Sequence, residues 1–264
     1  MRVMITGVTG TLGAALGRAC LARGDTVLGV GRKATAPPSV CSESIANAQC
    51  TSRDAADLLD RDPDLMLLCA GQIESEVGPG GLPLPHTTES IHRINSVFPS
   101  LLALEAAERR RARRLDVIAI GSIADGSPSA FGPVYHASKA SLHHFVTGAG
   151  PIIHAMNPRV RLRLYRPGVI KGPLSWAPTV RLNERGRRIR ARRCQGAPEA
   201  DVVAASILAF AAGDDWVGGD REPLSFRLLK HFWALSPNLY YRLQIGTWRR
   251  VNKFGTGEGD PPEV

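Results

Sequence analysis

A glycine-rich turn between a short apolar segment and a helical pattern constrains the fold of this chain most. Residues 2–6 are typical of a β-strand, residues 7–13 (GVTGTLG) follow, and residues 14–21 have apolar positions at helical spacing. A second apolar strand is predicted over residues 26–30. Glycines in such a turn let a pyrophosphate approach the backbone at a helix N-terminus. The pattern therefore predicts a nucleotide-binding strand–helix–strand unit, although an ordinary glycine-rich turn is the simpler alternative.

The residues after the second strand indicate which dinucleotide such a unit would bind. A carboxylate there would bind the ribose 2′-hydroxyl of NAD(H), whereas cations suit the 2′-phosphate of NADP(H). Here the strand continues into Gly31, Arg32 and Lys33, without an acidic residue. We expect NADP(H) to be preferred over NAD(H), with solvated loop charges as the alternative reading of both cations.

Further apolar segments predict the rest of an α/β architecture. Residues 64–69 form the continuous apolar run of a buried parallel strand, and they end in Ala70-Gly71, where small side chains leave room for a ligand. Residues 115–121 and 161–165 are two more predicted strands. We expect a doubly wound parallel sheet with helices on both faces.

A long helix is predicted over residues 88–114. Asn95 is a polar residue within its apolar side, where it could also be a capping or core-satisfied amide. Residues 109–114 are predicted to be its basic end, placed favourably at the negative end of the helix dipole.

Tyr135 and Lys139 lie four residues apart in a segment that reads as the start of a helix. Side chains at this spacing share one helix face. A nearby cation favours the phenolate and lowers the tyrosine pKa toward neutrality, which suits a general acid or base. Alone the pair is weak evidence, because surface helices often carry a Tyr and a Lys at this spacing.

Other features strengthen the pair. Ser122 ends the strand that precedes it, and Pro167-Gly168 follows the next strand. The chain resembles the short-chain dehydrogenase/reductase family over about residues 1–215. The resemblance depends on the glycine turn, Ala70-Gly71, Asn95, Ser122, Tyr135, Lys139 and Pro167-Gly168, in the order and spacing of the family. It implies a Rossmann-type fold and a NAD(P)-dependent oxidoreductase in which residues 1–222 form a single domain.

The resemblance also implies roles for the catalytic residues. Hydride passes from NADPH to a carbonyl carbon while Tyr135 donates a proton to the carbonyl oxygen. Lys139 lowers the Tyr135 pKa and bonds the nicotinamide ribose, Ser122 orients the carbonyl, and Asn95 holds a water that connects Lys139 to solvent. The residues expected at the cofactor are Thr6, Gly7, Thr9, Gly10, Thr11, Leu12, Gly13, Arg32, Lys33, Ala70, Gly71, Tyr135, Lys139, Pro167, Gly168 and Ile170.

Two residues depart from the compact members of the family. Gly10 comes one residue earlier than usual, a spacing closer to that of the sugar-nucleotide-modifying branch. Gly172 replaces the Thr that often follows the Pro-Gly turn, so the backbone of Ile170 is left to supply part of a carboxamide contact. The main hypothesis is an NADPH-dependent ketoreductase. The alternatives are a sugar-nucleotide epimerase or dehydratase and a non-catalytic NADP(H)-sensing protein.

The segment after the Pro-Gly turn, residues 172–198, is predicted to be a substrate lid. Seven arginines fall within residues 181–193. They could recruit a phosphate or pyrophosphate, which would favour an anionic, sugar-linked or lipid-linked carbonyl substrate. The alternative is a solvated basic helix.

The C-terminal part mixes aromatic and leucine residues with Arg, Lys and His over residues 223–254. This composition predicts an amphipathic extension of two helices broken at Pro237, which could contact a membrane surface, another subunit or the substrate pocket. Residues 255–264 are predicted to be disordered.

The net charge of +9 indicates attraction to anions, but no motif supports nucleic-acid binding. The five cysteines form no CxxC pair, and no metal site is expected. No apolar run reaches the length of a membrane span, and no leader precedes the first strand. We expect a cytoplasmic homo-oligomer acting on a small-molecule carbonyl compound, with peripheral contact at the inner membrane face as an open reading.

Overall fold

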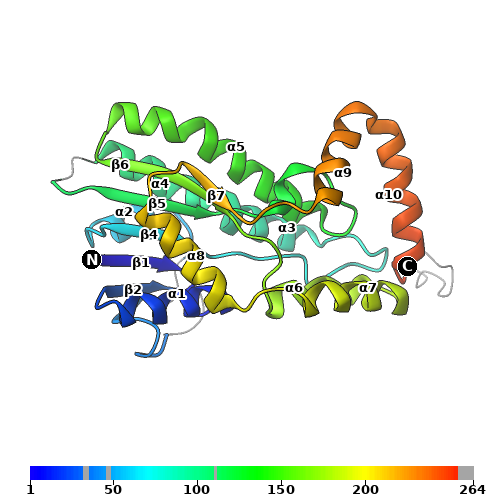
Figure 1. The fold of residues 1–264 in the computed structure, drawn as a ribbon, viewed down its shortest axis with the longest axis horizontal. Coiled ribbons are helices and arrows are strands. Elements are labelled where there is room, and N and C mark those ends of the chain that lie inside the picture. Colours follow the sequence, from blue (N-terminus) through cyan, green and yellow to red (C-terminus); the bar gives the residue numbers. More distant parts are fainter. Residues whose placement is uncertain (32–35, 46–48, 110–111, 255–264) are drawn as a thin grey trace.

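The computed structural model describes residues 1–31, 36–45, 49–109 and 112–254, and its centre is a parallel β-sheet (Figure 1). Seven described strands pair in the order β3-β2-β1-β4-β5-β6-β7, and every pairing is parallel. Their bounds are β1 Arg2–Thr6, β2 Thr26–Val30, β3 Glu43–Ile45, β4 Leu65–Leu68, β5 Leu115–Ile120, β6 Val160–Arg166 and β7 Val217–Gly219. The predicted doubly wound Rossmann-type sheet is confirmed.

Helices cover both faces of the sheet. Helices α1 (Thr11–Ala22) and α8 (Ala200–Ala212) contact each other on one face, and α2 (Ser52–Leu59), α4 (Phe98–Glu108) and α5 (Pro133–Met156) cover the other. Successive residues of one strand serve the two layers: Met66 belongs to the α4–α5 side, and Leu67 to the α1–α8 side. Burial on both faces explains why the strands read as continuous apolar runs rather than alternating ones.

The strand order reverses between β1 and β4. The chain proceeds outward from β1 to β2 and β3, and then returns to the other side of β1 with β4. In open parallel sheets, ligands bind outside the carboxyl ends of the strands at such a reversal. The glycine turn after β1 and Ala70-Gly71 after β4 both lie at this point.

The helix predicted over residues 88–114 is divided and shorter. It consists of α3 (Pro85–His92), a π-helical turn η1 (Arg93–Val97) and α4, which ends at Glu108. The prediction that residues 109–114 form its basic end is wrong: Arg109 has extended backbone angles, φ −79° and ψ 132°. Its guanidinium binds the carboxylates of Asp60 and Glu105 instead, at the start of the connection to β5.

The segments outside the sheet gather beyond its carboxyl edge (Figure 1). They are η2 (Ile123–Gly126), α6 (Pro173–Trp176), η3 (Ala177–Arg181), α7 (Glu184–Gln195), α9 (Leu224–Leu235) and α10 (Pro237–Val251). Helices α9 and α10 meet at Ser236, just before Pro237, and α10 contacts α7. Among the described helices, none combines the length and the apolar content that crossing a membrane requires.

Candidate active site

The glycine turn is closed by tight backbone packing. Gly7 has a φ of +70°, its N–H donates to Val30 O at 2.8 Å, and a Cβ there would lie 2.7 Å from Ala70 Cα. A Cβ at Gly13 would lie 2.2 Å from Gly7 O. Both positions therefore need glycine, one for its backbone angles and both for lack of space.

The start of α1 suits a dinucleotide phosphate. The helix has no side-chain cap and no acidic residue in its first turn, and Thr9, Gly10 and Thr11 are exposed. Free N–H groups and the positive end of the dipole make such a terminus an anion site. Thr6 fastens the turn to the end of β4, because its Oγ1 accepts from Ala70 N at 3.1 Å. The residues present fit a nicotinamide dinucleotide, whereas Arg32 and Lys33, on which the predicted preference for NADP(H) depends, lie outside the described residues.

The loop after β6 approaches this turn. Gly168 N donates to Asp220 Oδ2 at 2.6 Å, and Ile170 packs against the core between the sheet and α1 and α8. Gly172 has a φ of +154°, and a Cβ there would lie 2.9 Å from Thr11 Oγ1. The segment predicted as a substrate lid therefore begins beside the predicted cofactor site.

Lys139 is held beneath the sheet edge. It is 5% exposed, its Nζ donates to Ile120 O at 2.8 Å, and the same atom is 6.0 Å from the centre of the Tyr135 ring. Burial disfavours the ammonium and lowers the pKa of Lys139 to about 8. The Lys139 ammonium is thus oriented by the strand end rather than exposed on a surface helix.

Tyr135 lies next to Ser122, as the resemblance implies. Burial raises the pKa of Tyr135, while a hydrogen bond with Ser122 and the charge of Arg190 oppose this rise. The expected lowering of the Tyr135 pKa toward neutrality is therefore not found in this structure. The pKa rises because the phenolate would be less well hydrated here than in water, and the negative charges of Glu74 and Asp125 add to the rise.

Ser122 is fixed by the turn that follows β5. It is 8% exposed, and its Oγ accepts from Ala124 N at 3.1 Å at the start of η2. The hydroxyl that the resemblance assigns to the carbonyl oxygen therefore stands beside the Tyr135 phenol, at the carboxyl end of the sheet.

Asn95 lies in the π-helical turn η1 and is fully buried. Its Oδ1 accepts from Gln72 N at 2.8 Å, and its Nδ2 donates to Gln72 O at 2.8 Å and to Ser138 Oγ at 2.9 Å. These bonds join the segment after β4 to α5. Asn95 is here a positioning residue for the Tyr–Lys helix, and its predicted water-holding role remains a prediction.

Glu74 is a site residue that the sequence did not reveal. It is 1% exposed, and its Oε1 accepts from Val134 N at 2.7 Å and from Tyr135 N at 3.1 Å. A carboxylate at a helix N-terminus satisfies free N–H groups and complements the dipole. Glu74 thus holds the first turn of α5, although no local pattern links it to a helix some sixty residues away.

A buried charge network joins the site to the C-terminal extension. Asp125 binds Arg166 through two hydrogen bonds of 2.7 and 2.5 Å and pairs with His143 at 2.8 Å. Burial alone would raise the pKa of Asp125, but the bonds from His143 and Arg166 hold it below its ordinary value. Glu222 binds both Arg166 and Lys230 of α9, so the extension is tied to the end of β6.

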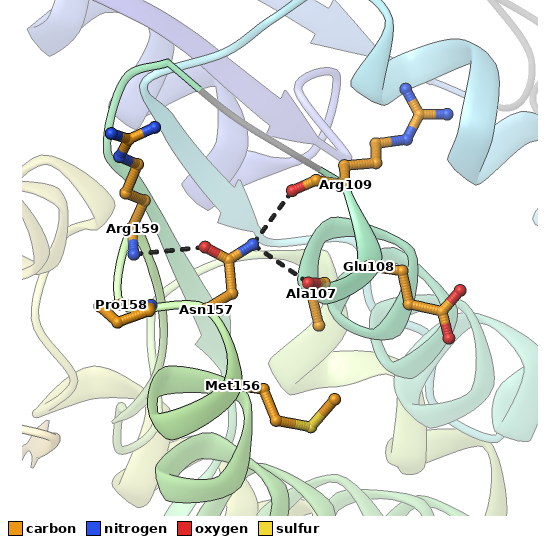
Figure 2. Close-up of a pocket in the computed structure, with 7 residues that line it drawn as sticks. All are labelled: Ala107, Glu108, Arg109, Met156, Asn157, Pro158 and Arg159. Atoms are coloured by element: carbon orange, nitrogen blue, oxygen red, sulfur yellow. Dashed lines mark hydrogen bonds between the residues drawn. The ribbon is translucent and has the colours of Figure 1, made fainter.

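A surface pocket of about 410 Å³ lies at the opposite edge of the sheet, between the ends of α4 and α5 (Figure 2). Asn157 bridges these ends: its Nδ2 donates to Ala107 O and Arg109 O, each at 3.0 Å. None of the predicted site residues lines this pocket. The pocket is therefore separate from the candidate active site, and Asn157 joins the two segments that border it.

Comparisons with known proteins agree with this geometry. Residues 3–78 match the model of the NAD-dependent epimerase/dehydratase family. No curated protein matches the sequence significantly.

Solved structures extend the likeness to nearly the whole chain. A short-chain dehydrogenase from Streptomyces avermitilis has a TM-score of 0.66 at 19% identity, covering 94% of this chain and 96% of its own. A short-chain dehydrogenase from Burkholderia cenocepacia in complex with NADP has 0.67 at 17%, covering 92% and 96%. The 3-oxoacyl-[acyl-carrier protein] reductase from Brucella melitensis in complex with NAD has 0.65 at 18%, covering 82% and 93%. The resemblance read from the sequence is thus confirmed at the level of the fold, which this chain shares with solved short-chain dehydrogenases.

Proposed function

We propose that this protein is an NADP(H)-dependent oxidoreductase that reduces a carbonyl compound to a secondary alcohol. The observation that carries the proposal is the placement of Tyr135, Ser122 and Lys139 together at the carboxyl edge of the sheet. The glycine turn that suits a dinucleotide lies at the same edge. A proton donor and a cofactor site at one edge are what hydride transfer to a carbonyl requires.

The chain's own residues supply the proton and the orientation. A reduced nicotinamide, when bound, supplies the hydride that adds to the carbonyl carbon. Ser122 donates a hydrogen bond to the carbonyl oxygen, and Tyr135 transfers its phenolic proton to that oxygen as the C=O bond becomes a C–O bond. The raised pKa of Tyr135 keeps the phenol protonated before the transfer. Lys139 then stabilises the phenolate until a proton returns from solvent, a path in which we place Asn95.

The preference for NADP(H) rests on Arg32 and Lys33, which follow β2 where an acidic residue would favour NAD(H). The neighbour from Burkholderia was solved with NADP and that from Brucella with NAD, so fold alone does not decide between them. A lower KM for NADPH than for NADH would support this assignment.

The test is the variant Tyr135→Phe, assayed with NADPH against a carbonyl panel that includes keto-sugars and lipid ketones. Removing the proton donor should lower kcat by about 10²–10⁴-fold. The dissociation constant for NADPH should change little, because only one hydroxyl is removed. Turnover of the variant comparable to that of the wild type would reject the assignment.

An epimerase or dehydratase is the second candidate. It is favoured by the family model matched over residues 3–78 and by the early position of Gly10. Such an enzyme would retain its cofactor and convert a sugar nucleotide without consuming NADPH in proportion to product. The ratio of NADPH oxidised to product formed separates the candidates: one for the reductase and near zero for the epimerase or dehydratase.

We also propose that α9 and α10 make a peripheral contact with an anionic membrane surface. The two helices carry exposed apolar side chains, namely Leu228, Leu235, Leu239, Tyr241 and Leu243. Exposed basic side chains accompany them, namely Arg227, Arg242, Arg249 and Arg250. Apolar side chains flanked by cations are typical of helices that lie at a lipid interface.

The test of this contact compares the double variant Leu235→Glu/Leu239→Glu with the wild type. Both proteins are co-sedimented with phosphatidylglycerol-containing vesicles. Loss of co-sedimentation in the variant alone would support the proposal. A wild type that does not sediment with vesicles, but whose mass by light scattering is halved in the variant, would instead identify this surface as a subunit interface.

A further inference from the structure

Arg181, the last residue of η3, is a buried cation whose side chain is incompletely bonded. Its side chain is among the most buried of the charged groups, with 3% exposure. Its Nε and Nη2 atoms have no hydrogen-bond partner within the described part of the chain. Burial lowers the pKa of Arg181, and only the charge of Glu74 opposes this effect. Burying a guanidinium without hydrogen-bond partners costs free energy, so an acceptor that bonds these two donors would stabilise the folded protein.

The side chain that faces Arg181 belongs to the proton-donor site. Glu74 interacts electrostatically with Arg181, and its Oε1 is used by the N–H groups of Val134 and Tyr135. Its Oε2 is another buried atom without a partner among the described residues. Arg181 is therefore connected to the first turn of α5, where Tyr135 lies.

Arg190 of α7 belongs to the same predicted lid segment, residues 172–198, and its charge also acts on Tyr135. The charge of Arg190 opposes the rise in the pKa of Tyr135. Burial in turn lowers the pKa of Arg190. Its Nε donates to Ser175 O at 2.6 Å, which fixes the guanidinium against α6. Within the described residues, neither Arg190 nor Arg181 has a carboxylate at ion-pair distance.

The remaining arginines of this segment are directed to solvent. Five of them are exposed, namely Arg185, Arg187, Arg188, Arg192 and Arg193. The charge of Asp125 also reaches Tyr135, but Asp125 is engaged by Arg166 and His143. The two guanidinium groups are therefore opposed by the carboxylate of Glu74, which leaves one positive charge beside Tyr135 unbalanced. A bound anion would balance that charge and accept hydrogen bonds from both arginines.

We propose that Arg181 and Arg190 form an oxyanion-binding subsite beside Tyr135, which takes a phosphate or carboxylate group of the carbonyl substrate. This inference rests on the proposed function for the identity of the ligand as substrate, but not for the existence of the subsite. Planar guanidinium groups pair with such groups in bidentate fashion, which fixes the orientation of the ligand as well as its affinity.

The base of this subsite is clamped by the end of α10. Lys253 N donates to Arg181 O at 3.0 Å, and Asn183 N donates to Val251 O at 3.0 Å. The side chain of Asn183 adds a bond from its Nδ2 to Arg250 O at 3.0 Å. The backbone that carries Arg181 is thus held from both sides, which gives the guanidinium a defined position.

The direct test is calorimetric binding of inorganic phosphate, and separately of acetate, to the full-length protein saturated with NADP⁺. Saturation occupies the dinucleotide phosphate site. We expect wild-type binding of at least one of the two anions, weakened about tenfold or more in Arg190→Met and in Arg181→Met. Arg192→Met is the matched control, because it removes the same charge from an exposed position of the same helix.

Several outcomes would overturn the subsite: no binding of either anion by the NADP⁺-saturated wild type, binding by Arg190→Met equal to that of the wild type, or equal weakening in Arg192→Met. Arg190 is only partly buried, so Arg190→Met keeps the test valid if Arg181→Met does not fold.

Kinetics separate this inference from the proposed function. The ratio of kcat/KM for dihydroxyacetone phosphate to that for dihydroxyacetone should fall in Arg190→Met, mainly through KM for the phosphate ester. Arginine-dependent anion binding without reduction of any carbonyl in the panel would retain the subsite and reject the reductase. If Arg190→Met left both the kcat/KM ratio and anion binding unchanged while carbonyl reduction persisted, the reductase would be retained and the subsite rejected.

Discussion

Two regions meet above the carboxyl edge of the sheet, and they are built by different means. The glycine turn after β1 is shaped by close backbone packing: a Cβ added at Gly13 would lie 2.2 Å from Gly7 O. The cover formed by α6, η3, α7 and α10 depends on long charged side chains and on a few bonds between distant backbone segments. The turn is determined by residues that are close together in the sequence. The cover depends on contacts between distant segments, such as those between η3 and the end of α10. A change in one region should therefore leave the function of the other largely intact.

Gly13→Ala should have the largest effect on stability and cofactor affinity, and its effect should be confined to the glycine turn. The new Cβ would meet backbone atoms of Gly7 and Val8 that cannot move without opening the turn. We expect NADP⁺ affinity to fall more than tenfold and the free energy of unfolding to fall by about 1–3 kcal/mol. Titration calorimetry and urea unfolding measure the two effects.

Gly148→Ala is the matched control for that variant. Gly148 lies within α5, and a Cβ there would have no atom within 4 Å. Alanine in a helix interior is favoured over glycine by about 0.5–1 kcal/mol, so this variant should be more stable than the wild type and should bind NADP⁺ normally. Equal losses in both variants would show that the turn tolerates side chains.

Lys139 lies in α5, outside both the glycine turn and the cover, and its contribution to the stability of the fold should depend on pH. The folded protein holds its pKa at about 8, below the unfolded value of 10.5, so the unfolded chain binds more protons between these values. Stability contributed through Lys139 therefore rises as pH increases from about 8 to about 10.5. The gain relative to Lys139→Met should be at most about 3 kcal/mol, since one pKa unit corresponds to 1.36 kcal/mol.

Urea unfolding of the wild type and Lys139→Met at pH 7, 8.5 and 10 measures this gain as a difference between the two proteins. Other titrating groups cancel in that difference. A difference that stays constant over this range would mean that Lys139 ionises in the folded protein as it does in water.

Asn183→Ala should have the smallest effect on stability and should be confined to the cover. Asn183 Oδ1 accepts from Gly186 N at 3.0 Å and caps α7, while its Nδ2 reaches the end of α10. Loss of an N-cap costs about 1 kcal/mol, and loosening of the cover should raise KM for the carbonyl substrate several-fold. NADP⁺ affinity should stay within twofold of the wild-type value.

Thr51→Ala provides the comparison, because Thr51 caps α2 in a capping box far along the chain from the cover. It should cost a similar amount of stability without changing either KM or cofactor affinity. If both variants altered KM equally, the effect would follow from general destabilisation rather than from the cover.

The sequence predicts the sheet and the glycine turn well because their signals are local. The turn, the strands on either side and the apolar runs of the sheet each depend on neighbours within a few residues. Ser122, Tyr135 and Lys139 could be named because they follow recognisable strand ends at fixed spacings. Even so, the raised pKa of Tyr135 could not be foreseen, because it depends on burial in the folded protein.

Other features have no local signature. Glu74 caps α5 across a long stretch of sequence, and the apolar stripe of residues 88–108 continues unbroken through the π-helical turn that contains Asn95. Arg181 and Arg190 look like the other five arginines in composition and differ from them only in burial. Tertiary contacts, rather than propensity, decide each of these cases.

The bond between Lys253 N and Arg181 O also has a consequence for biosynthesis. The glycine turn and its neighbouring strands can form while the ribosome is still adding the second half of the chain. The cover must wait for roughly 70 more residues after Arg181, which takes about 4–14 s at roughly 5–20 residues per second. Under the proposed function, the dinucleotide would bind the nascent chain before the substrate site is enclosed, and it would act as an early folding ligand for the first half.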